Sequence, residues 1–268
     1  MWDGMTPKDS FLCDVLEYSA GAFAETSISA IAEIPLAIYL NGRKVIRLLC
    51  TGKDPEALAV GFLKSEGFLK DRDDLIEIEV EEKSRSLCVH ISAHCPPFPE
   101  DTAGGSVILG SAGGAGFDKN PDPVNEINPH SDLKVSSEEI LFLMRELDGR
   151  SELFRATGGC HNAALCEPGR ILIFCEDLGR HNAIDMICGK CFLEDIDTRD
   201  KLIVTTGRIG SEILVKALRI GVSVLVSRSA ATRLSIHLAR KTGMTLIGYV
   251  RKNRLTVYNH AGRIKGIS

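Results

Sequence analysis

Apolar and polar residues alternate with a period of two in the first third of the chain, a pattern typical of β-strands that are buried on one face. The segments 34–40 and 43–49 both show this alternation. Between them stand Asn41 and Gly42, a pair that readily adopts the positive φ values of a two-residue turn. The pattern therefore predicts a β-hairpin.

A short helix and a second pair of strands are expected to follow this hairpin. Asp54, which precedes a proline, has the form of an N-terminal helix cap, and Gly67 has that of a helix stop. The segments 75–82 and 86–92 again resemble strands that pair with each other. We expect residues 1–105 to form a small α+β domain.

The second half of the chain alternates between strand-like and helix-like runs, after a capping-box pattern at Ser136 and Glu139. The segments 163–167 and 170–175, joined by Pro168-Gly169, suggest a hairpin. The other expected elements are helices at 140–147, 180–193, 209–220 and 231–242, and strands at 202–206, 222–227 and 245–250. Such alternation predicts a parallel sheet with right-handed crossovers, whose ligand sites lie beyond the carboxyl ends of the strands. We expect residues 106–268 to form this α/β domain.

Residues 96–129 connect the two regions. They contain six of the ten prolines and a glycine-rich run at 110–116. Proline and glycine at this density do not sustain regular structure, so the segment is expected to be a linker or a mobile functional loop.

Composition narrows the class of protein. A hydrophobic content of 44% over 268 residues is enough for one large domain or two modest ones. No apolar run approaches the roughly 18 to 20 residues of a membrane span, and the N-terminus lacks the basic start of a signal peptide. Nine cysteines, an odd number, favour reduced thiols over a disulfide framework. We expect a soluble cytoplasmic protein that binds neither a membrane nor nucleic acid.

Charge is divided unevenly along the chain. The last 68 residues contain 13 Lys and Arg but only one acid, Glu212, whereas the first 200 contain 19 basic and 35 acidic residues. The net charge of −4 therefore conceals a basic part and an acidic part. Such asymmetry indicates either a polyanionic partner or docking between two parts of the chain, and both explanations remain open here.

Arginines and glycines follow several of the expected strands. Gly207 and Arg208 follow one strand and Arg228 follows the next, while Arg180 and His181 follow an earlier one. Helix N-termini, backbone N–H groups and guanidinium groups in such positions bind anions. The arrangement predicts a phosphate-bearing ligand, although a single such motif is equally compatible with an ordinary turn and a solvated arginine.

Two histidines belong to this region. His181 stands four residues before Asp185 on the expected helix, so the carboxylate either orients the imidazole for proton transfer or forms a surface pair with it. His161 follows two glycines and a cysteine and precedes an apolar strand. Its position suits either a ligand contact or a structural histidine.

The spacing of His161, Cys188 and Cys191 resembles the zinc site of nucleoside deaminases. That chemistry needs a glutamate two residues after the histidine, where this chain has Ala163, and a proline before the first cysteine, where it has Ile187. Without the glutamate, the metal-bound water lacks its proton shuttle. We therefore expect neither zinc nor another metal, with both cysteines as buried thiols of a helix face.

The motifs described above, together with several others, resemble those of the FdhD family of formate dehydrogenase accessory proteins. Members of this family are associated with sulfuration of the molybdenum cofactor. The motifs that carry the resemblance extend over most of the chain. They are Glu33-Ile-Pro-Leu, Leu40-Asn-Gly, Leu58-Ala-Val-Gly-Phe-Leu, Ser65-Glu-Gly-Phe, Thr157-Gly-Gly-Cys-His, the block 176–185, Gly207-Arg208, Glu212, Lys216, and Gly248-Tyr-Val-Arg to Val257-Tyr258.

The resemblance implies a cytidine-deaminase-like, three-layer α/β fold for the larger domain, without the zinc chemistry of that fold. It also implies binding of the molybdenum cofactor as Mo-bis(molybdopterin guanine dinucleotide), whose pyrophosphates suit basic strand ends. The family segment that contacts this cofactor corresponds here to Tyr249, Val250, Arg251, Lys252, Asn253 and Arg254. The implied partners are the formate dehydrogenase apoenzyme, a cysteine desulfurase as sulfur donor, and a second copy of the chain in a homodimer.

One departure from the family affects the implied sulfurtransferase activity. The family carries two cysteines on a loop, of which the first is taken as the persulfide carrier, and these positions are Ala112 and Ala115 here. A methyl group neither forms a thiolate nor holds sulfane sulfur. Sulfur transfer then needs another thiol, with Cys160, Cys188 and Cys191 as candidates. The alternative is a non-catalytic chaperone that binds and delivers the cofactor.

Overall fold

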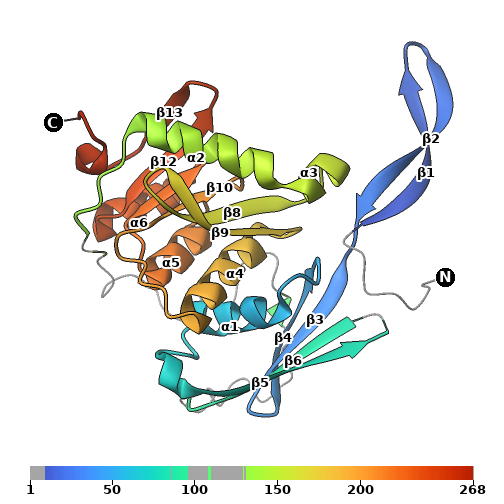
Figure 1. Ribbon diagram of the computed structural model, residues 1–268, viewed down its shortest axis with the longest axis horizontal. Helices are drawn as coiled ribbons and strands as arrows, with labels where there is room; N and C mark the ends of the chain where they lie inside the picture. The colour runs from blue at the N-terminus through green and yellow to red at the C-terminus, as the bar shows by residue number, and fades with distance from the viewer. Residues whose placement is uncertain (1–9, 85, 96–107, 110–128, 130, 268) are drawn as a thin grey trace.

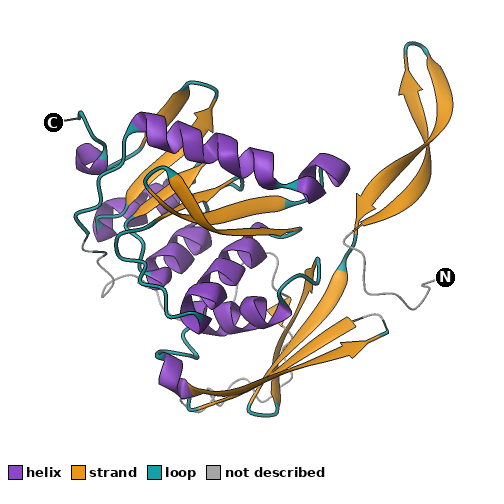
Figure 2. Cartoon of the chain, viewed as in Figure 1, coloured by secondary structure: helices purple, strands orange, loops and turns teal. Residues whose placement is uncertain are grey.

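The computed structural model describes residues 10–84, 86–95, 108–109, 129 and 131–267. These residues form three β-sheets and six α-helices, which Figure 2 distinguishes by colour. The glycine-rich run and almost all of the expected linker, including Ala112 and Ala115, lie outside the described residues.

An N-terminal hairpin that the sequence pattern did not predict forms the two-stranded sheet. Strand β1 (Ser10–Ser19) pairs antiparallel with β2 (Ala22–Ile31), and the hairpin extends away from the rest of the molecule (Figure 1). One face carries exposed apolar side chains, namely Leu12, Leu16, Tyr18 and Phe23. Because no core formed by the described residues covers either face, apolar residues occur on both, and the alternation that identifies a strand is weak.

The predicted hairpin and the second strand pair are confirmed, and they belong to one five-stranded sheet with the order β5-β6-β3-β4-β7. Its strands are β3 (Ile34–Leu40), β4 (Arg43–Cys50), β5 (Leu75–Lys83), β6 (Ser86–Ala93) and β7 (Ile108–Leu109). Asn41 and Gly42 have φ values of 49° and 76°, as the predicted turn requires.

The predicted helix after this hairpin is α1 (Pro55–Ser65), but Asp54 does not cap it as we expected. The backbone of Asp54 is left-handed, and its side chain makes no capping hydrogen bond. The Asp54 carboxylate instead lies 2.6 Å from Lys190 Nζ. A contact with a distant helix has therefore replaced the local one that the sequence indicated.

The six-stranded sheet has the order β13-β12-β11-β10-β8-β9. Its strands are β8 (His161–Glu167), β9 (Arg170–Asp177), β10 (Leu202–Thr205), β11 (Val224–Ser227), β12 (Thr245–Arg251) and β13 (Arg254–Val257). The predicted parallel pairing holds for β10, β11 and β12. The hairpin expected around Pro168-Gly169 is also confirmed, since β8 pairs antiparallel with β9. Strand β8 therefore runs antiparallel to β10 as well, and the tight turn after β12 makes β13 antiparallel to β12.

Helices cover both faces of this sheet (Figure 1). On one face lies α2 (Ser137–Arg150), which begins at the predicted capping box of Ser136 and Glu139 and is followed by α3 (Glu152–Thr157). The other face packs against α4 (Arg180–Leu193), α5 (Ser211–Ile220) and α6 (Arg233–Thr242). The three-layer α/β arrangement is thus confirmed. None of the described helices is long and apolar enough to cross a lipid bilayer.

Helix α1 lies between α4 and the five-stranded sheet, so it joins the N-terminal part of the chain to the six-stranded sheet (Figure 1). The apolar core is continuous across this contact. It includes Leu58 and Leu63 of α1, Ile184 and Ile187 of α4, and Leu36 of β3.

Candidate functional site

The predicted ligand-binding residues converge on one edge of the six-stranded sheet. The carboxyl ends of β10, β11 and β12 share this edge because these strands are parallel. Strand β8 runs in the opposite direction, so its first residue, His161, lies at the same edge. His161 pairs with Asp177, the last residue of β9, which brings the start of α4 to this edge as well.

Backbone hydrogen bonds connect the loops along this edge. The Arg228 N–H donates to the Thr205 carbonyl (3.0 Å), and the Tyr249 N–H donates to the Ser229 carbonyl (3.0 Å). Each loop is therefore held by the one beside it, and the cationic side chains extend from a fixed backbone.

Arg180 and Gly207 meet at the centre of the edge. A Cβ on Gly207 would lie 2.8 Å from the Cβ of Arg180, so the two loops approach this closely only because residue 207 is glycine. The Nε of Arg180 is buried and has no hydrogen-bond partner among the described residues. Such an unpaired buried donor costs about 1 to 3 kcal/mol, a cost that an anionic ligand would relieve.

Both histidines of the edge are uncharged at neutral pH. Burial lowers the pKa of His161, and the positive charges of Arg180 and Arg228 lower it further. Burial also lowers the pKa of His181 to about 3, with contributions from Arg180 and Lys216. The positive charge at this edge therefore resides on the arginines.

His181 contacts Glu212, and not Asp185 as the i, i+4 spacing suggested. Its Nε2 lies 3.0 Å from Glu212 Oε2, so the neutral imidazole donates its N–H to this carboxylate. Asp185 instead accepts hydrogen bonds in the interior from Lys216 Nζ (2.7 and 2.9 Å) and Ser65 Oγ (2.7 Å). Asp185 therefore neither orients His181 nor forms a surface pair with it.

A cavity of about 130 Å³ lies where β11 and β12 end, against α2. Four cationic side chains line it: Arg145, Arg228, Arg251 and Lys252. Among the described residues, the single acid in its wall is Asp148, whose carboxylate lies 3.2 Å from the Arg228 guanidinium. Burial raises the pKa of Asp148. The cavity is thus strongly cationic and suits a polyanion.

The structure separates the residues of the predicted segment 249–254. Arg251 and Lys252 line the cavity, and Val250 forms part of its buried wall. Arg251 also donates through Nε to the Arg228 carbonyl (3.2 Å). The predicted residues that are exposed and do not line the cavity are Tyr249, Asn253, Arg254 and, on the loop after β10, Arg208.

Two buried acids beside this edge have structural partners that the sequence did not reveal. Asp177 accepts hydrogen bonds from the N–H (2.9 Å) and the hydroxyl (3.0 Å) of Thr51. Glu176 pairs with Lys53 (2.8 Å) and accepts a hydrogen bond from Ser151 (2.6 Å). Both acids thereby join the candidate site to the loop after β4. Thr51 and Lys53 lie 126 and 123 residues from these acids, so no local pattern could identify the contacts.

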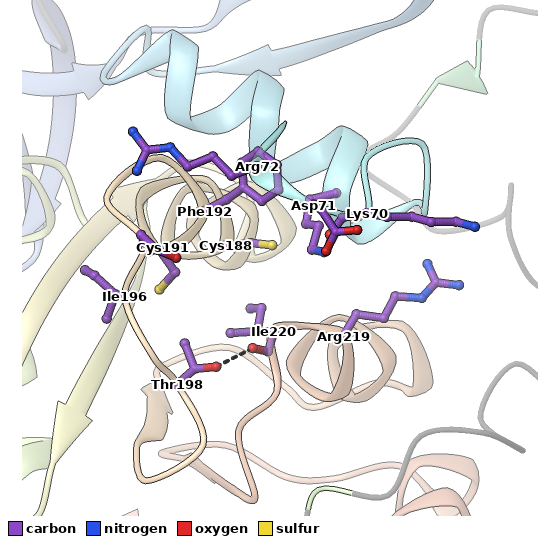
Figure 3. A pocket seen from close by; sticks show the side chains of 12 residues that line it. Lys70, Asp71, Arg72, Cys188, Cys191, Phe192, Ile196, Thr198, Arg219 and Ile220 are labelled. Carbon is purple, nitrogen blue, oxygen red and sulfur yellow. Dashed lines mark hydrogen bonds between the residues drawn. The ribbon is translucent and has the colours of Figure 1, made fainter. Parts of the chain in front are cut away.

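Two of the three candidate thiols line a separate cavity of about 220 Å³ beside α4 (Figure 3). They are Cys188 and Cys191, and the cavity is also lined by Lys70, Arg72 and Arg219. Burial raises the pKa of each thiol to about 12. Both cysteines are therefore protonated at neutral pH, and the thiol is a poor nucleophile.

We call the strand ends that carry His161, Arg180, Arg228 and Arg251 the basic edge. Cys160, which directly precedes His161, is the candidate thiol nearest to it. Its side chain is 5% exposed, with Sγ 3.6 Å from Ser151 Oγ and 3.7 Å from Asn162 Oδ1. Burial raises the pKa of this thiol too. The thiolate form is thus disfavoured at all three positions.

The zinc ligands of a deaminase do not come together. Within the part of the chain that the structure describes, one group of three His, Cys, Asp or Glu side chains has its ligand atoms within 4.8 Å of one another. This group contains neither His161 nor Cys188 nor Cys191, and it belongs to the five-stranded sheet.

Comparison with known proteins agrees with this architecture. The model of the FdhD/NarQ family matches residues 31–265. The chain is 37% identical to the sulfur carrier protein FdhD of Bacillus subtilis, over 97% of this chain and 100% of the relative. It is 36% identical to the sulfur carrier protein FdhD of Listeria innocua, over 93% of this chain and 97% of the relative.

A solved structure shows the same fold. The crystal structure of a proposed formate dehydrogenase accessory protein from Desulfotalea psychrophila superposes with a TM-score of 0.78 at 28% sequence identity. The superposition covers 96% of this chain and 100% of the other. The family match spans most of the residues, and the similarity to the curated relatives is nearly full length. The chain therefore belongs to the FdhD/NarQ family.

Proposed function

We propose that this protein is an accessory protein of a molybdenum-dependent formate dehydrogenase, which binds Mo-bis(molybdopterin guanine dinucleotide) as cargo and delivers it to the apoenzyme. Family membership supports the general role, since the curated relatives are sulfur carrier proteins. The cationic cavity at the ends of β11 and β12 is the observation that supports cofactor binding most directly.

The positive charge and the hydrogen-bond donors of the basic edge suit a ligand with several phosphate groups. Arg228, Arg251 and Lys252 provide charge-assisted hydrogen-bond donors at the cavity, and Arg180 provides another beside Gly207. Gly179 precedes α4 and offers no capping side chain, so the first N–H groups of this helix remain available to an anion. A bis(guanine dinucleotide) carries two pyrophosphates, which these two groups of donors can bind together.

The proposed role also includes sulfur transfer to the cofactor, which needs a thiol other than the family's loop cysteines. Cys160 is the best placed of the three candidates because it adjoins His161 at the basic edge. Persulfide formation there requires local opening that exposes Sγ to a desulfurase. Mass spectrometry after incubation with a cysteine desulfurase and cysteine tests this, with a persulfide expected on wild type and absent from Cys160→Ser.

The second candidate function is a non-catalytic chaperone that shields and delivers the cofactor. Ala112 and Ala115 favour it, as does the burial of Cys160, Cys188 and Cys191. In this case wild type acquires no persulfide on any cysteine in the desulfurase experiment, yet the protein still binds the cofactor.

We also propose that the protein acts in the cytoplasm as a homodimer. The exposed apolar face of the β1–β2 hairpin supports an association of two chains, since Leu12 and Leu16 are 80% and 66% exposed. Sedimentation analysis of wild type and of Leu12→Glu tests the contact, and a monomeric wild type would contradict it.

Rescue of a bacterial strain that lacks its own family member tests the proposed function. We expect wild type to restore formate dehydrogenase activity, and Arg228→Ala combined with Arg251→Ala to restore much less at equal protein level. Arg170→Ala, at the start of β9 and so at the opposite edge of the sheet, serves as the control and should restore activity fully. Equal rescue by the double variant would contradict a role of this cavity.

A further inference from the structure

Glu81, Cys88 and His90 lie together on the five-stranded sheet, apart from the site described above. The antiparallel register of β5 and β6 places Glu81 directly opposite Cys88. His90 is two residues further along β6 and so points to the same face. The ligand atoms of the three side chains all lie within 4.8 Å of one another, and His90 Nε2 is 3.8 Å from Glu81 Oε2.

This face of the sheet is the one turned away from the apolar core. Leu87, Val89 and Ile91 alternate with the cluster along β6, and these three side chains belong to the core on the α1 side. Cys88 and His90 therefore lie on the opposite face of the sheet. Glu81 is exposed and His90 is half-buried, whereas Cys88 is buried with 5% of its surface exposed. An ion therefore approaches the thiol from the side of Glu81 and His90.

From this geometry we infer that Glu81, Cys88 and His90 form a binding site for a divalent transition-metal ion, for which Zn²⁺ is the best match. Sulfur, imidazole nitrogen and carboxylate oxygen are the three donor types that Zn²⁺ takes in proteins. Mg²⁺ and Ca²⁺ prefer oxygen ligands alone, so a thiol and an imidazole select against them.

The spacing of the side chains fits a tetrahedral ion. Ligand atoms at roughly 2.0 to 2.3 Å from such an ion lie roughly 3.3 to 3.7 Å apart, close to the separation of Nε2 and Oε2 here. Three protein ligands leave a fourth position for water. Glu79, opposite His90, and Glu77 extend the row of exposed acids along β5 and add negative charge that attracts a cation.

Neighbouring side chains already suit this cluster to a cation. Lys83 Nζ lies 3.1 Å from Glu81 Oε2, so a positive group already stands beside this carboxylate. Lys83 is exposed at the end of β5, so its flexible stem can turn into solvent when an ion binds. The His90 ring stacks on Tyr39, with centroids 4.6 Å apart and planes at 16°, which fixes the orientation of the imidazole.

The site was not expected from the sequence, from which we predicted no metal. Its ligands come from two strands and have neither a Cys-x-x-Cys nor a His-x-x-x-His spacing, so only the β5–β6 register brings them together. The inference is independent of the proposed cofactor site, which lies on the other sheet.

Titration of the purified full-length chain with Co²⁺ tests the site, because Co²⁺ takes the same ligands and reports them by absorption. We expect one equivalent to produce a thiolate-to-cobalt charge-transfer band with the visible bands of a tetrahedral ion, and Zn²⁺ to displace it. Cys88→Ser should abolish the charge-transfer band. His90→Gln and Glu81→Gln should each weaken Co²⁺ binding at least about tenfold.

Cys95→Ser is the matched control, since Cys95 follows the same strand but lies outside the cluster, and it should bind Co²⁺ as wild type does. Thermal unfolding shows whether each variant is folded. If Cys88→Ser does not fold, the Co²⁺ affinities of His90→Gln and Glu81→Gln test the site instead. Absence of the band in wild type would overturn the inference. So would an unchanged band in Cys88→Ser, or wild-type affinity in both His90→Gln and Glu81→Gln.

Discussion

Gly61 in α1 lies so close to Asp185 in α4 that a Cβ on the glycine would be 1.7 Å from the Asp185 carbonyl oxygen. At the same crossing, a Cβ on Gly189 would be 1.8 Å from the Ala57 carbonyl oxygen. The two helix backbones are thus in direct contact. Helix α1 belongs to the N-terminal region and α4 starts at the basic edge. This crossing therefore fixes the position of the N-terminal region relative to the basic edge.

Gly61→Ala should therefore destabilise the protein by about 3 kcal/mol or more, because backbone atoms cannot move aside as a flexible side chain can. Urea denaturation measures the free energy of unfolding. Gly149→Ala in α2 is the control, since its Cβ would meet no atom within 4 Å, and it should stabilise by about 0.5 to 1 kcal/mol. Equal stability of Gly61→Ala and wild type would show that the helices do not touch here.

The buried pair of Lys216 and Asp185 provides a second test of the same interface. Lys216→Met should cost about 3 to 5 kcal/mol of unfolding free energy, because it leaves the Asp185 carboxylate buried without its cation. Adding Asp185→Asn should recover part of this loss, since the unpaired charge is then removed. A double variant that is less stable than Lys216→Met would contradict the pairing seen here.

His181 gives a prediction on pH. Its pKa is lowered to about 3 in the fold, from an ordinary value of 6.5, so the unfolded chain binds more protons between these two values. The protein should therefore lose stability as the pH falls through this range, by up to about 1.4 kcal/mol per pH unit from this residue.

NMR titration of the His181 ring measures its pKa in the folded protein directly, and no protonation should be seen above about pH 4. His181→Gln, which keeps an N–H donor for Glu212 but does not titrate, should show a smaller loss of stability in acid. A His181 pKa at or above its ordinary value would contradict the neutral imidazole described here.

Thiol burial predicts the pattern of alkylation. Cys13 is exposed and should react with iodoacetamide within minutes at neutral pH, whereas Cys160, Cys188 and Cys191 should react much more slowly, at the rate at which opening of the structure exposes them. Peptide mass spectrometry distinguishes these sites. Rapid alkylation of Cys160 in the folded protein would instead favour it as a sulfur carrier, because it would show that Sγ is accessible.

The sequence allowed prediction of those features whose causes are local. The β3–β4 turn at Asn41-Gly42, the Ser136/Glu139 capping box and the whole of α4 follow from turn chemistry and periodicity, and all were confirmed. The convergence of Arg180, Gly207 and Arg228 also followed, because parallel strands present their carboxyl ends together.

The features that were missed depend on contacts between distant residues. Asp185 was assigned to His181 because both lie on α4, but its partner is Lys216 on α5. Asp54 was assigned as a cap, whereas it pairs with Lys190. Spacing along the chain predicts which residues lie on the same helix or strand. Which side chains contact each other depends on how the helices and strands pack.

Calorimetric titration with GDP, a fragment of the guanine dinucleotide, tests most directly whether the basic edge binds the cofactor. We predict that GDP binds wild type, that salt weakens binding, and that Arg251→Ala costs about 1.5 to 3 kcal/mol because a charge-assisted phosphate contact is lost. The control Arg170→Ala should bind as wild type does. GDP binding that is insensitive to salt and equal in Arg251→Ala, Arg170→Ala and wild type would contradict the account.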